Sequence, residues 1–191
     1  MWNLYWHFGD DYRHRNALRA REPLPDWFSG LDAEAVRARC LSETLAQVRK
    51  HGYAHHIIRL MILGNYAIQR GWEPEEVTQW FRANFVDAYD WVMVPNVIGM
   101  SQHADGGLMA TKPYLSGGAY INRMSDYCGD CEYRLGPQAC PFTAGYWAFL
   151  DRHEARFGRN PRMAQPLGGL RRLPDRRQVA AQERDRGSDP P

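Results

Sequence analysis

Apolar residues recur at helical spacing in several separate stretches of the chain. Four large aromatic side chains within residues 1–9 follow this spacing with no capping residue ahead of them, so the sequence enters this predicted helix part-way. From Asp32, a possible N-cap, apolar positions repeat every three or four residues up to Gly52. Cys40 falls on the buried face of that second predicted helix. Residues 10–30, in between, predict a long irregular surface connection.

The most apolar predicted helix covers residues 53–69 and is hydrophobic on nearly every side, with Gly71 ending it. We expect this helix at the centre of the fold. His55, His56 and Arg59 near its start need polar partners there, because burying an unpaired polar group costs free energy. His56 and Arg59 share a face that suits contact with an acid or a phosphate, although a lone histidine in such a helix is more often a core residue.

Two further stretches extend the predicted core. Residues 72–85 open with Pro74 and two glutamates and carry an apolar stripe that includes Trp80, which predicts an amphipathic helix. Residues 87–112 follow neither helical nor strand periodicity and are broken by Pro95 and three glycines. An irregular segment this apolar must have its backbone polar groups satisfied by the fold or by a ligand, so we expect a ligand pocket there.

The four cysteines carry the clearest chemical signal. Cys128, Cys131 and Cys140 follow the order C-x2-C-x8-C-P, and Cys40 lies far upstream. Four thiolates can hold Zn²⁺ or a cubane iron–sulfur cluster, and the spacing alone leaves the two nearly even, with the remote Cys40 a slight indication of the cluster. Plain buried cysteines and two disulfides are the alternatives, and the lack of a signal peptide argues against disulfides.

Composition narrows the class of protein without identifying it. With 191 residues, 44% of them hydrophobic and 13% aromatic, the chain can form one domain with a sizeable core. Residues 171–191 hold six Arg and four acidic residues, which accounts for the whole net charge of +2, so nucleic-acid binding would need a local basic patch. No apolar run is long enough to span a membrane. Residues 140–157 predict a closing helix, and we expect residues 167–191 to be disordered.

Three segments of the sequence resemble a known family. They read YAHHIIRLMILGNYA, DAYDWVMVPNVIGMSQHADGGLMATKPYLSGGAYINRMSDYC and ACPFTAGYWAFLDRH. They are similar to the C-terminal catalytic half of the bacterial iron–sulfur cryptochromes and photolyases, the group of prokaryotic (6-4) photolyases. The resemblance runs from about Trp2 to Pro166. It implies an all-α fold over residues 1–166, the helical FAD-binding domain of photolyases truncated at its N-terminus.

By this resemblance, the cofactors are FAD and a [4Fe-4S] cluster. His55 and His56 fall beside the family's lesion pocket, with His56 the better candidate for proton transfer to the photoproduct, and Trp80 falls on the proposed electron path to FAD. Met93 falls on the position that faces flavin N5. The residues implied at the FAD site are His56, Arg59, Asp87, Tyr89, Met93 and Asn96. The implied cluster ligands are Cys40, Cys128, Cys131 and Cys140.

The implied function is light-driven repair of UV-damaged DNA by a monomeric, cytoplasmic carbon–carbon lyase. The sequence departs from the family pattern in lacking the N-terminal antenna domain and the first helices of the FAD domain. The loop between Cys131 and Cys140 is also shorter, and Phe81 stands where some members have an electron-relaying Tyr. We therefore expect a C-terminal part of such an enzyme, which alone would hold half of a flavin pocket. A blue-light receptor that does not need His56, and a metal-stapled DNA-binding module without flavin, are the alternatives.

Overall fold

The regular structure of this protein is helical, as the computed structural model of residues 2–136 and 140–191 shows. Within those residues, the nearest approach to a strand is one isolated parallel bridge between Glu22 and Trp72. The predicted all-α fold is therefore confirmed. None of the described helices combines the length and the apolar character needed to cross a bilayer.

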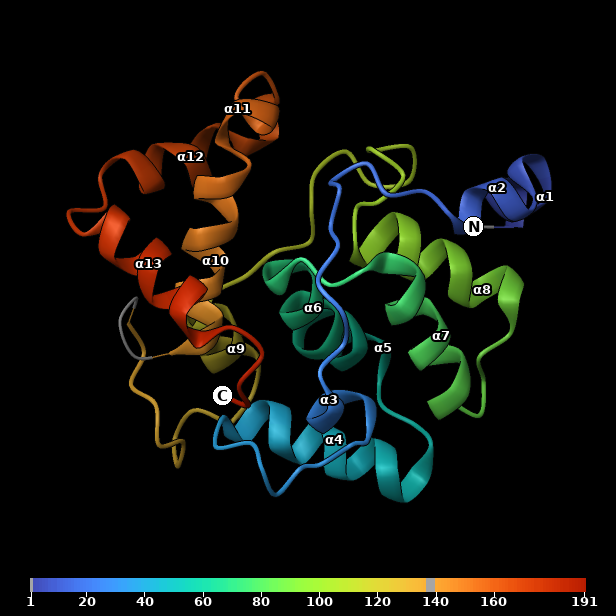
Figure 1. Cartoon of the computed structure of the whole chain (residues 1–191), viewed down its shortest axis with the longest axis horizontal. Coiled ribbons are helices and arrows are strands. Elements are labelled where there is room, and N and C mark those ends of the chain that lie inside the picture. The colour runs from blue at the N-terminus through green and yellow to red at the C-terminus, as the bar shows by residue number, and fades with distance from the viewer. Residues whose placement is uncertain (1, 137–139) are drawn as a thin grey trace.

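The helices form two groups on either side of a central run. Figure 1 shows α6 near the middle, with α7 and α8 on one side and α10, α12 and α13 on the other. The elements in chain order are α1 (Trp2–Phe8), α2 (Asp10–Arg13), α3 (Asp26–Ser29), α4 (Arg39–His51), α5 (His56–Ile58), η1 (Arg59–Gly64), α6 (Asn65–Arg70), α7 (Pro74–Asn84), α8 (Asp90–Val94), η2 (Pro95–Ser101), α9 (Gly118–Met124), α10 (Pro141–Arg152), α11 (Glu154–Phe157), η3 (Pro161–Met163), α12 (Ala164–Arg171) and α13 (Arg176–Arg186).

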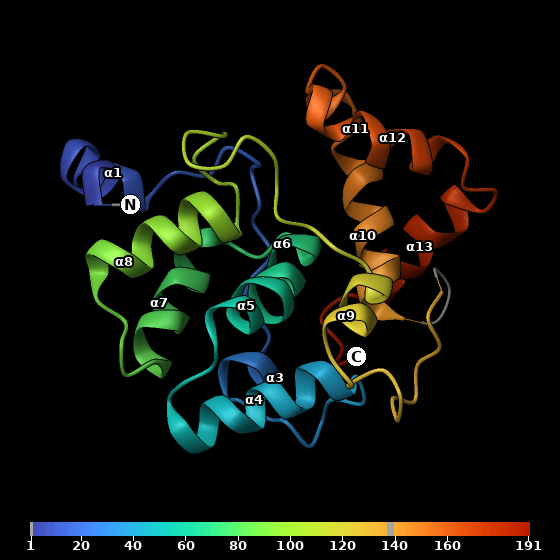
Figure 2. The same ribbon diagram turned by 180° about the vertical axis from the view of Figure 1, so that it is seen from behind.

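The central run consists of α5, η1 and α6, which follow one another without a break and were predicted as one apolar helix. Residues 60–69 of this run are all buried, and Gly71 ends it in the left-handed region with φ +76°. Seen from behind in Figure 2, the run lies between α7 and α8 on one side and α9 on the other. Its middle segment, η1, is a π-helix, a form that frequently marks functional sites.

Gly64 and Ser101 lie in close contact between the two π-helical segments, η1 and η2. A Cβ added at Gly64 would overlap Ser101 Oγ and lie 3.2 Å from Ser101 Cβ. Gly-to-Ala substitution inside a helix ordinarily stabilises it, but here overpacking should reverse the sign. We expect Gly64→Ala to lower the free energy of unfolding by about 1–3 kcal/mol in denaturant melts. Adding Ser101→Gly should recover most of the loss, and an unchanged Gly64→Ala midpoint would contradict the contact.

Helix α4 begins later than the pattern of apolar positions indicated. Asp32 is not its N-cap: its carboxylate accepts a hydrogen bond from the Ala35 backbone N–H at 3.2 Å, and the helix starts at Arg39. Aspartate side chains form such local turns as readily as they cap helices, which explains why the helix was predicted to start too early. Cys40 therefore lies in the first turn of α4, with only 6% of its surface exposed.

Residues 87–112 contain more helix than their irregular pattern predicted. Helix α8 and η2 occupy residues 90–101, and Pro95 stands at the first position of η2. A proline at this position is compatible with helix geometry because the missing N–H would have no partner in the first turn. The helical periodicity was hidden because the α-helix α8 and the π-helix η2 have different numbers of residues per turn.

The C-terminal segment also differs from expectation. Residues 167–191, which we expected to be disordered, include most of α12 and all of α13. Val179 of α13 is fully buried, and Glu183 pairs with Arg70 of α6 in a nearly solvent-free ion pair. The apolar face of α13 is short, so it does not stand out from the charged residues around it in the sequence.

Candidate functional site

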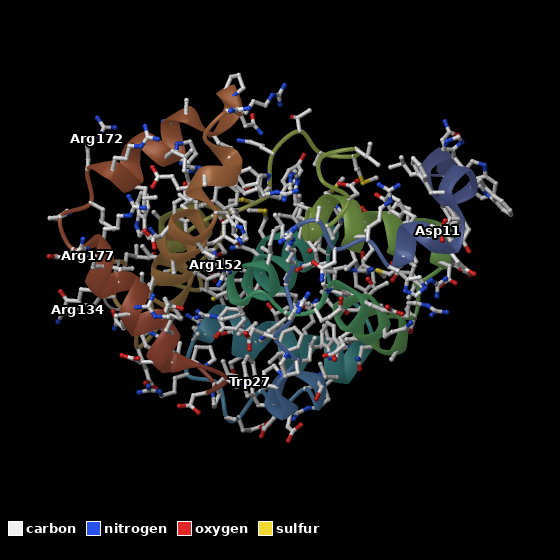
Figure 3. The ribbon with its side chains drawn as sticks, turned by 45° about the horizontal axis from the view of Figure 1, so that its top comes forward. Asp11, Trp27, Arg134, Arg152, Arg172 and Arg177 are labelled. Carbon is white, nitrogen blue, oxygen red and sulfur yellow. The ribbon has the colours of Figure 1, made fainter. Side chains whose placement is uncertain are left out.

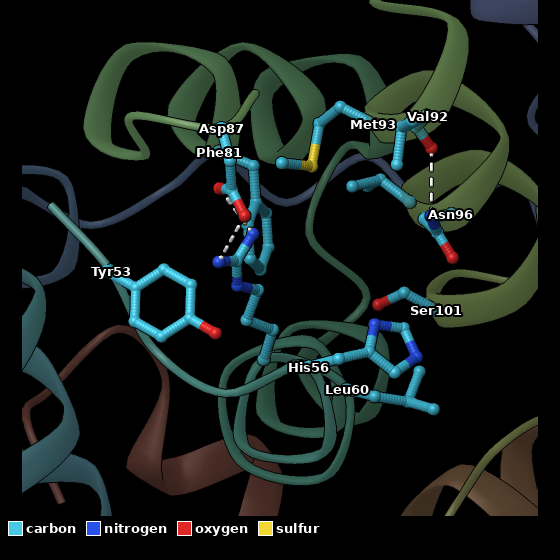
Figure 4. A pocket seen from close by; sticks show the side chains of 11 residues that line it. Tyr53, His56, Leu60, Phe81, Asp87, Val92, Met93, Asn96 and Ser101 are labelled. Atoms are coloured by element: carbon cyan, nitrogen blue, oxygen red, sulfur yellow. Dashed lines mark hydrogen bonds and ion pairs between the residues drawn. The ribbon is translucent and has the colours of Figure 1, made fainter. Parts of the chain in front are cut away.

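A pocket of about 240 Å³ opens between the central helical run and η2. Figure 4 shows its lining side chains converging from these elements and from the α7 and α8 region. Five of the residues implied at the FAD site line it, namely His56, Arg59, Asp87, Met93 and Asn96. The structure thus brings most of the predicted site together around one cavity.

Arg59 and Asp87 form a two-pronged ion pair at the wall of the pocket. The guanidinium Nη1 and Nη2 donate to the two carboxylate oxygens at 2.8 and 2.9 Å, and Nε donates to the Ala54 carbonyl at 2.6 Å. The guanidinium also lies over the rings of Phe85 and Tyr53, at 4.3 and 4.9 Å from their centroids. Because every donor nitrogen is engaged, the pair holds one orientation before any ligand arrives.

The Arg59 hydrogen bonds keep the pKa of Asp87 below its ordinary value of about 3.9. A depressed carboxylate pKa contributes stability that is fully present above the unfolded-state pKa and is lost as the pH falls through the folded-state pKa. We therefore expect the Tm difference between the unsubstituted chain and Asp87→Asn to be constant from pH 5 to 8 and to shrink below about pH 4. Thermal melts across this range measure it, and a difference that persists at pH 2 would contradict the pairing.

Asn96 presents a hydrogen-bond acceptor that the protein itself does not use. Its amide nitrogen donates to the Val92 carbonyl at 2.9 Å, while Oδ1 is buried with no partner among the described residues. A buried acceptor without a donor costs free energy, and the cost is removed when a ligand supplies an N–H or O–H. Asn96 Oδ1 is thus a candidate contact for a bound ring nitrogen.

The two adjacent histidines have different surroundings. His56 lines the pocket although its surface, like that of His55, is largely exposed; partial burial, Arg59 and His55 lower its pKa, which favours the neutral imidazole at neutral pH. His55 is exposed and serves as the N-cap of α5, where its Nδ1 accepts from the Ile57 backbone N–H at 3.3 Å. Of the two, only His56 is placed to reach a pocket ligand.

Trp80 and Tyr89 lie outside the pocket lining. Trp80 is buried behind Phe81, with ring centroids 5.1 Å apart, and its indole N–H donates to the Phe28 carbonyl at 3.1 Å. Phe81 itself faces the cavity. Tyr89 precedes α8 and is 66% exposed. Trp80 can act on a pocket ligand only through Phe81 or across it.

Sequence reasoning missed several apolar and small residues of the pocket wall. Some of them lie one helical turn from a predicted residue, for example Leu60 from His56. Others are next to one in the sequence, for example Val97 next to Asn96. That spacing was the available signal, because residues four apart on a helix share a face. The additional lining residues are Tyr53, Leu60, Phe81, Val92, Val97 and Ser101.

The four cysteine thiols gather at a second place, where α4 meets the loop of residues 125–140. Cys40 and Cys140 are buried and belong to the same hydrophobic cluster, against which Cys128 packs. Burial raises the pKa of Cys40, and the nearby Cys140, Cys128 and Cys131 raise it further. Burial, Cys140 and Cys131 likewise raise the pKa of Cys128. Thiols that repel one another as anions are suited to a shared cation, which removes that repulsion.

The thiols do not stand at ligand distances. Among the described residues, no group of three or more His, Cys, Asp or Glu side chains is spaced as a metal site. The shorter Cys131–Cys140 loop predicted from the sequence includes residues 137–139, which lie outside the described part of the chain. Gly118 leaves room beside Cys140, since a Cβ there would lie 2.6 Å from its Sγ. Four thiols are the donors that a sulfur-rich metal group requires, but among the described residues they are not spaced to hold one.

Comparison with known proteins gives two similar sequences. Over 177 residues, or 91% of this chain, the sequence is 44% identical to a (6-4) photolyase from Agrobacterium fabrum, and the match covers 34% of that protein. The chain therefore spans about a third of that relative's length. An uncharacterized protein from Acanthamoeba polyphaga mimivirus is 46% identical over 54 residues, 28% of this chain and 44% of that protein. No protein-family model matches the chain.

Proposed function

We propose, from a sequence similarity that supports the photolyase family, that this chain is the flavin-binding C-terminal part of a light-driven DNA repair enzyme. Because the chain spans about a third of its relative, the activity, the FAD, the [4Fe-4S] cluster and the damaged DNA are all part of the proposal. The observation that carries it is the convergence of His56, Arg59, Asp87, Met93 and Asn96 on one cavity.

The pocket has the features that a flavin ring requires on one side. Leu60, Val92, Met93 and Val97 supply apolar walls for a planar ring, and Asn96 Oδ1 supplies an acceptor for a ring N–H. The Arg59 and Asp87 pair fixes a charged edge whose orientation does not depend on the ligand. FAD would therefore meet a preformed polar edge and an apolar face, which lowers the ordering cost of binding.

When bound and reduced, FAD supplies one electron to the UV photoproduct under light. The residues of this chain orient the ring and control the proton. Met93 and Leu60 exclude water from the ring, and the Arg59 and Asp87 pair holds its polar edge. His56 is neutral in the free chain because of burial and Arg59, and the negative phosphates of bound DNA would raise its pKa toward that of a proton donor.

The proposed cluster has a structural role in this account. Cys40 belongs to α4, whereas Cys128, Cys131 and Cys140 belong to the loop that leads into α10. A metal group shared by the four thiols would tie the two ends of the core together across about 90–100 residues of sequence. No electron step is assigned to it.

Anaerobic purification of the full chain, followed by UV–visible spectroscopy with iron, sulfide and flavin analysis, tests the proposal. We expect flavin bands after addition of FAD, and about four irons per chain. Zinc in place of iron would overturn the cluster assignment. A chain that binds neither added FAD nor riboflavin would overturn the flavin site, and with it the proposed function.

His56 provides a more specific prediction for repair. His56→Gln should keep the affinity for FAD within about threefold and lower the rate of photoproduct repair by about 10²-fold or more, since general acid catalysis contributes roughly this much. His55→Gln, on an exposed side chain next to it, is the matched control and should retain most of the rate. Repair is measured by chromatography of an irradiated oligonucleotide. Repair unaffected by His56→Gln would remove His56 from the proton-transfer role, and an unsubstituted chain that binds FAD without repairing the photoproduct would favour the blue-light receptor instead.

A further inference from the structure

A second cleft, of about 290 Å³, lies at the far end of the central helical run from the flavin pocket. Residues 18–22, the C-terminal end of α6 and the C-terminal end of α10 form its walls. Figure 3 labels Arg152 of α10, which lies near the centre of this view of the molecule. The basic side chains that line the cleft are Arg19, Arg21, Arg70, Arg152 and His153, against one carboxylate, Glu22.

Most of this positive charge is unpaired. Arg19 and Arg21 are exposed, and in the described part of the chain their guanidiniums make no hydrogen bond or ion pair. Arg152 donates from Nη2 to the Gln69 carbonyl at 2.9 Å and from Nε to His153 Nε2 at 3.3 Å, which leaves Nη1 for a ligand. Elsewhere in the structure, arginines such as Arg59 and Arg49 each pair with a carboxylate through two guanidinium nitrogens.

The backbone holds Arg19 at the mouth of the cleft in an unfavourable conformation. Arg19 has φ +57°, in the left-handed region that side-chain-bearing residues seldom adopt. Asn16 maintains this turn: its amide nitrogen donates to the Ala20 carbonyl at 2.6 Å, and its Oδ1 accepts from the Ala20 N–H at 2.9 Å. Strain of this kind concentrates at functional positions.

Arg70 supplies a buried charge at the floor of the cleft. Its side chain is 7% exposed and pairs with Glu183, while its Nε is buried with no partner. Glu183 is shared with Arg186, so it does not neutralise both guanidiniums. The local potential also acts on His153, whose pKa is lowered to about 4 by burial and by Arg152 and Arg156. Burial is the largest cause of this shift, and the two neighbouring guanidiniums add to it in the direction expected beside positive charge.

We propose that this cleft binds the phosphate groups of a nucleotide or of a nucleic-acid backbone. Several guanidinium groups around one space suit the tetrahedral oxygens of phosphate better than a single planar carboxylate. The site is separate from the flavin pocket. Ser101 lines the flavin pocket and Gln102 lines the cleft, and Gln102 Nε2 donates to Ser101 Oγ at 2.8 Å across the wall between them.

The cleft therefore accounts for a local basic patch in a chain whose net charge is only +2. Phosphate contacts position a ligand without reading its bases, so sequence preference is not expected here. Binding should also be salt-dependent, because each neutralised phosphate releases counterions.

The test compares the unsubstituted full chain with the triple variant Arg19→Gln, Arg21→Gln and Arg152→Gln. Inorganic pyrophosphate is the probe, measured by calorimetry and by the His153 imidazole resonance in NMR. We expect saturable binding with a shift of the His153 resonance, and at least tenfold weaker binding in the triple variant. The control variant removes the same charge at Arg134, Arg159 and Arg177, which are exposed and lie outside the cleft. It should bind as the unsubstituted chain does.

Two ligands then distinguish the source of the phosphate. Competition by ADP alone identifies a nucleotide site, and competition by a duplex oligonucleotide, with a log–log salt slope reduced by about 2 in the triple variant, identifies the DNA backbone. Either outcome supports the proposal. Equal loss of binding in the cleft and control variants, or pyrophosphate binding that leaves the His153 resonance unmoved, would overturn it. Because these readouts involve no flavin, they stand apart from the test of the repair function.

Discussion

Cys40→Ser is expected to leave the chain with little or no bound iron and with a markedly lower Tm. The expectation rests on the proposed cluster and on the position of Cys40, which is the one cysteine outside the loop of residues 125–140. In the described residues of that loop, 125–136 and 140, no helix lies between the end of α9 and the start of α10. Without the fourth thiol, packing and largely exposed ion pairs such as Arg39 with Asp130 would be left to hold the loop against α4.

The size of the effect follows from the length of chain that the cluster closes. A cross-link that spans about 100 residues stabilises a fold by on the order of 4 kcal/mol through the entropy of the unfolded chain. Loss of a shared metal group also removes its bonds to the other three thiols, of which Cys140 is buried and Cys128 and Cys131 are half-buried. We therefore expect a loss of this order in anaerobic denaturant melts, accompanied by faster proteolysis between Met124 and Cys140.

Thr44→Ser is the matched control for Cys40→Ser. Thr44 lies one turn along the same buried face of α4, is fully buried, and donates from Oγ1 to the Cys40 carbonyl at 2.6 Å. Serine keeps that hydrogen bond and removes one methyl group, which costs about 1 kcal/mol. Iron content should be unchanged in this control. Equal iron in Cys40→Ser and the unsubstituted chain would remove Cys40 from the ligand set.

The sequence predicted the central helix and its ending because both depend on local properties. A helix that is apolar on all sides must be buried. Glycine commonly ends a helix because it adopts the left-handed conformation readily, as Gly71 does here. The start of α4 was predicted wrongly because the Asp32 carboxylate can form either of two local hydrogen bonds. Its carboxylate could cap the helix or close a turn, and it closes a turn with Ala35. Sequence alone does not rank such alternatives.

The sequence predicted where the pocket lies, but only some of the residues that line it. Residues 87–112 were expected to provide a ligand site, and Met93 and Asn96 line the 240 Å³ pocket. Their helical form was missed because a π-helix shifts the phase of the apolar pattern after Pro95. The resemblance supplied His56, Arg59 and Asp87 together, whereas no spacing rule joins Asp87 to a helix that begins 31 residues earlier. Tyr89 was placed in the same set, yet its side chain is largely exposed.

The tail shows a different limit. An amphipathic face of Val179 and Ala180 is too short to be detected in a window dominated by charge. What orders α13 is long-range: Glu183 pairs with Arg70, and the Trp27 indole N–H donates to the Ser188 carbonyl at 2.8 Å. Such contacts join residues more than 100 positions apart, so the local pattern carries no trace of them.

Arg59→Ala is expected to weaken FAD binding by tenfold or more without unfolding the chain. The substitution removes the two hydrogen bonds to Asp87 and the stacking on Tyr53, which lines the pocket, so both the charged edge and one wall of the pocket lose their fixed orientation. A tenfold change corresponds to 1.4 kcal/mol, which is within the range for one hydrogen-bonded charge pair. Flavin fluorescence titration measures the affinity.

Arg82→Ala is the matched control, because Arg82 forms a similar ion pair with Asp90, at 2.6 Å, and neither residue lines the flavin pocket. It should leave the affinity for FAD within about twofold. Asp87→Asn separates orientation from charge, since it keeps a hydrogen-bond acceptor for Arg59 while removing the negative charge. If orientation is what matters, Asp87→Asn should lose less affinity than Arg59→Ala. A loss in Arg82→Ala equal to that in Arg59→Ala would mean that general stability, and not the pocket edge, determines flavin binding.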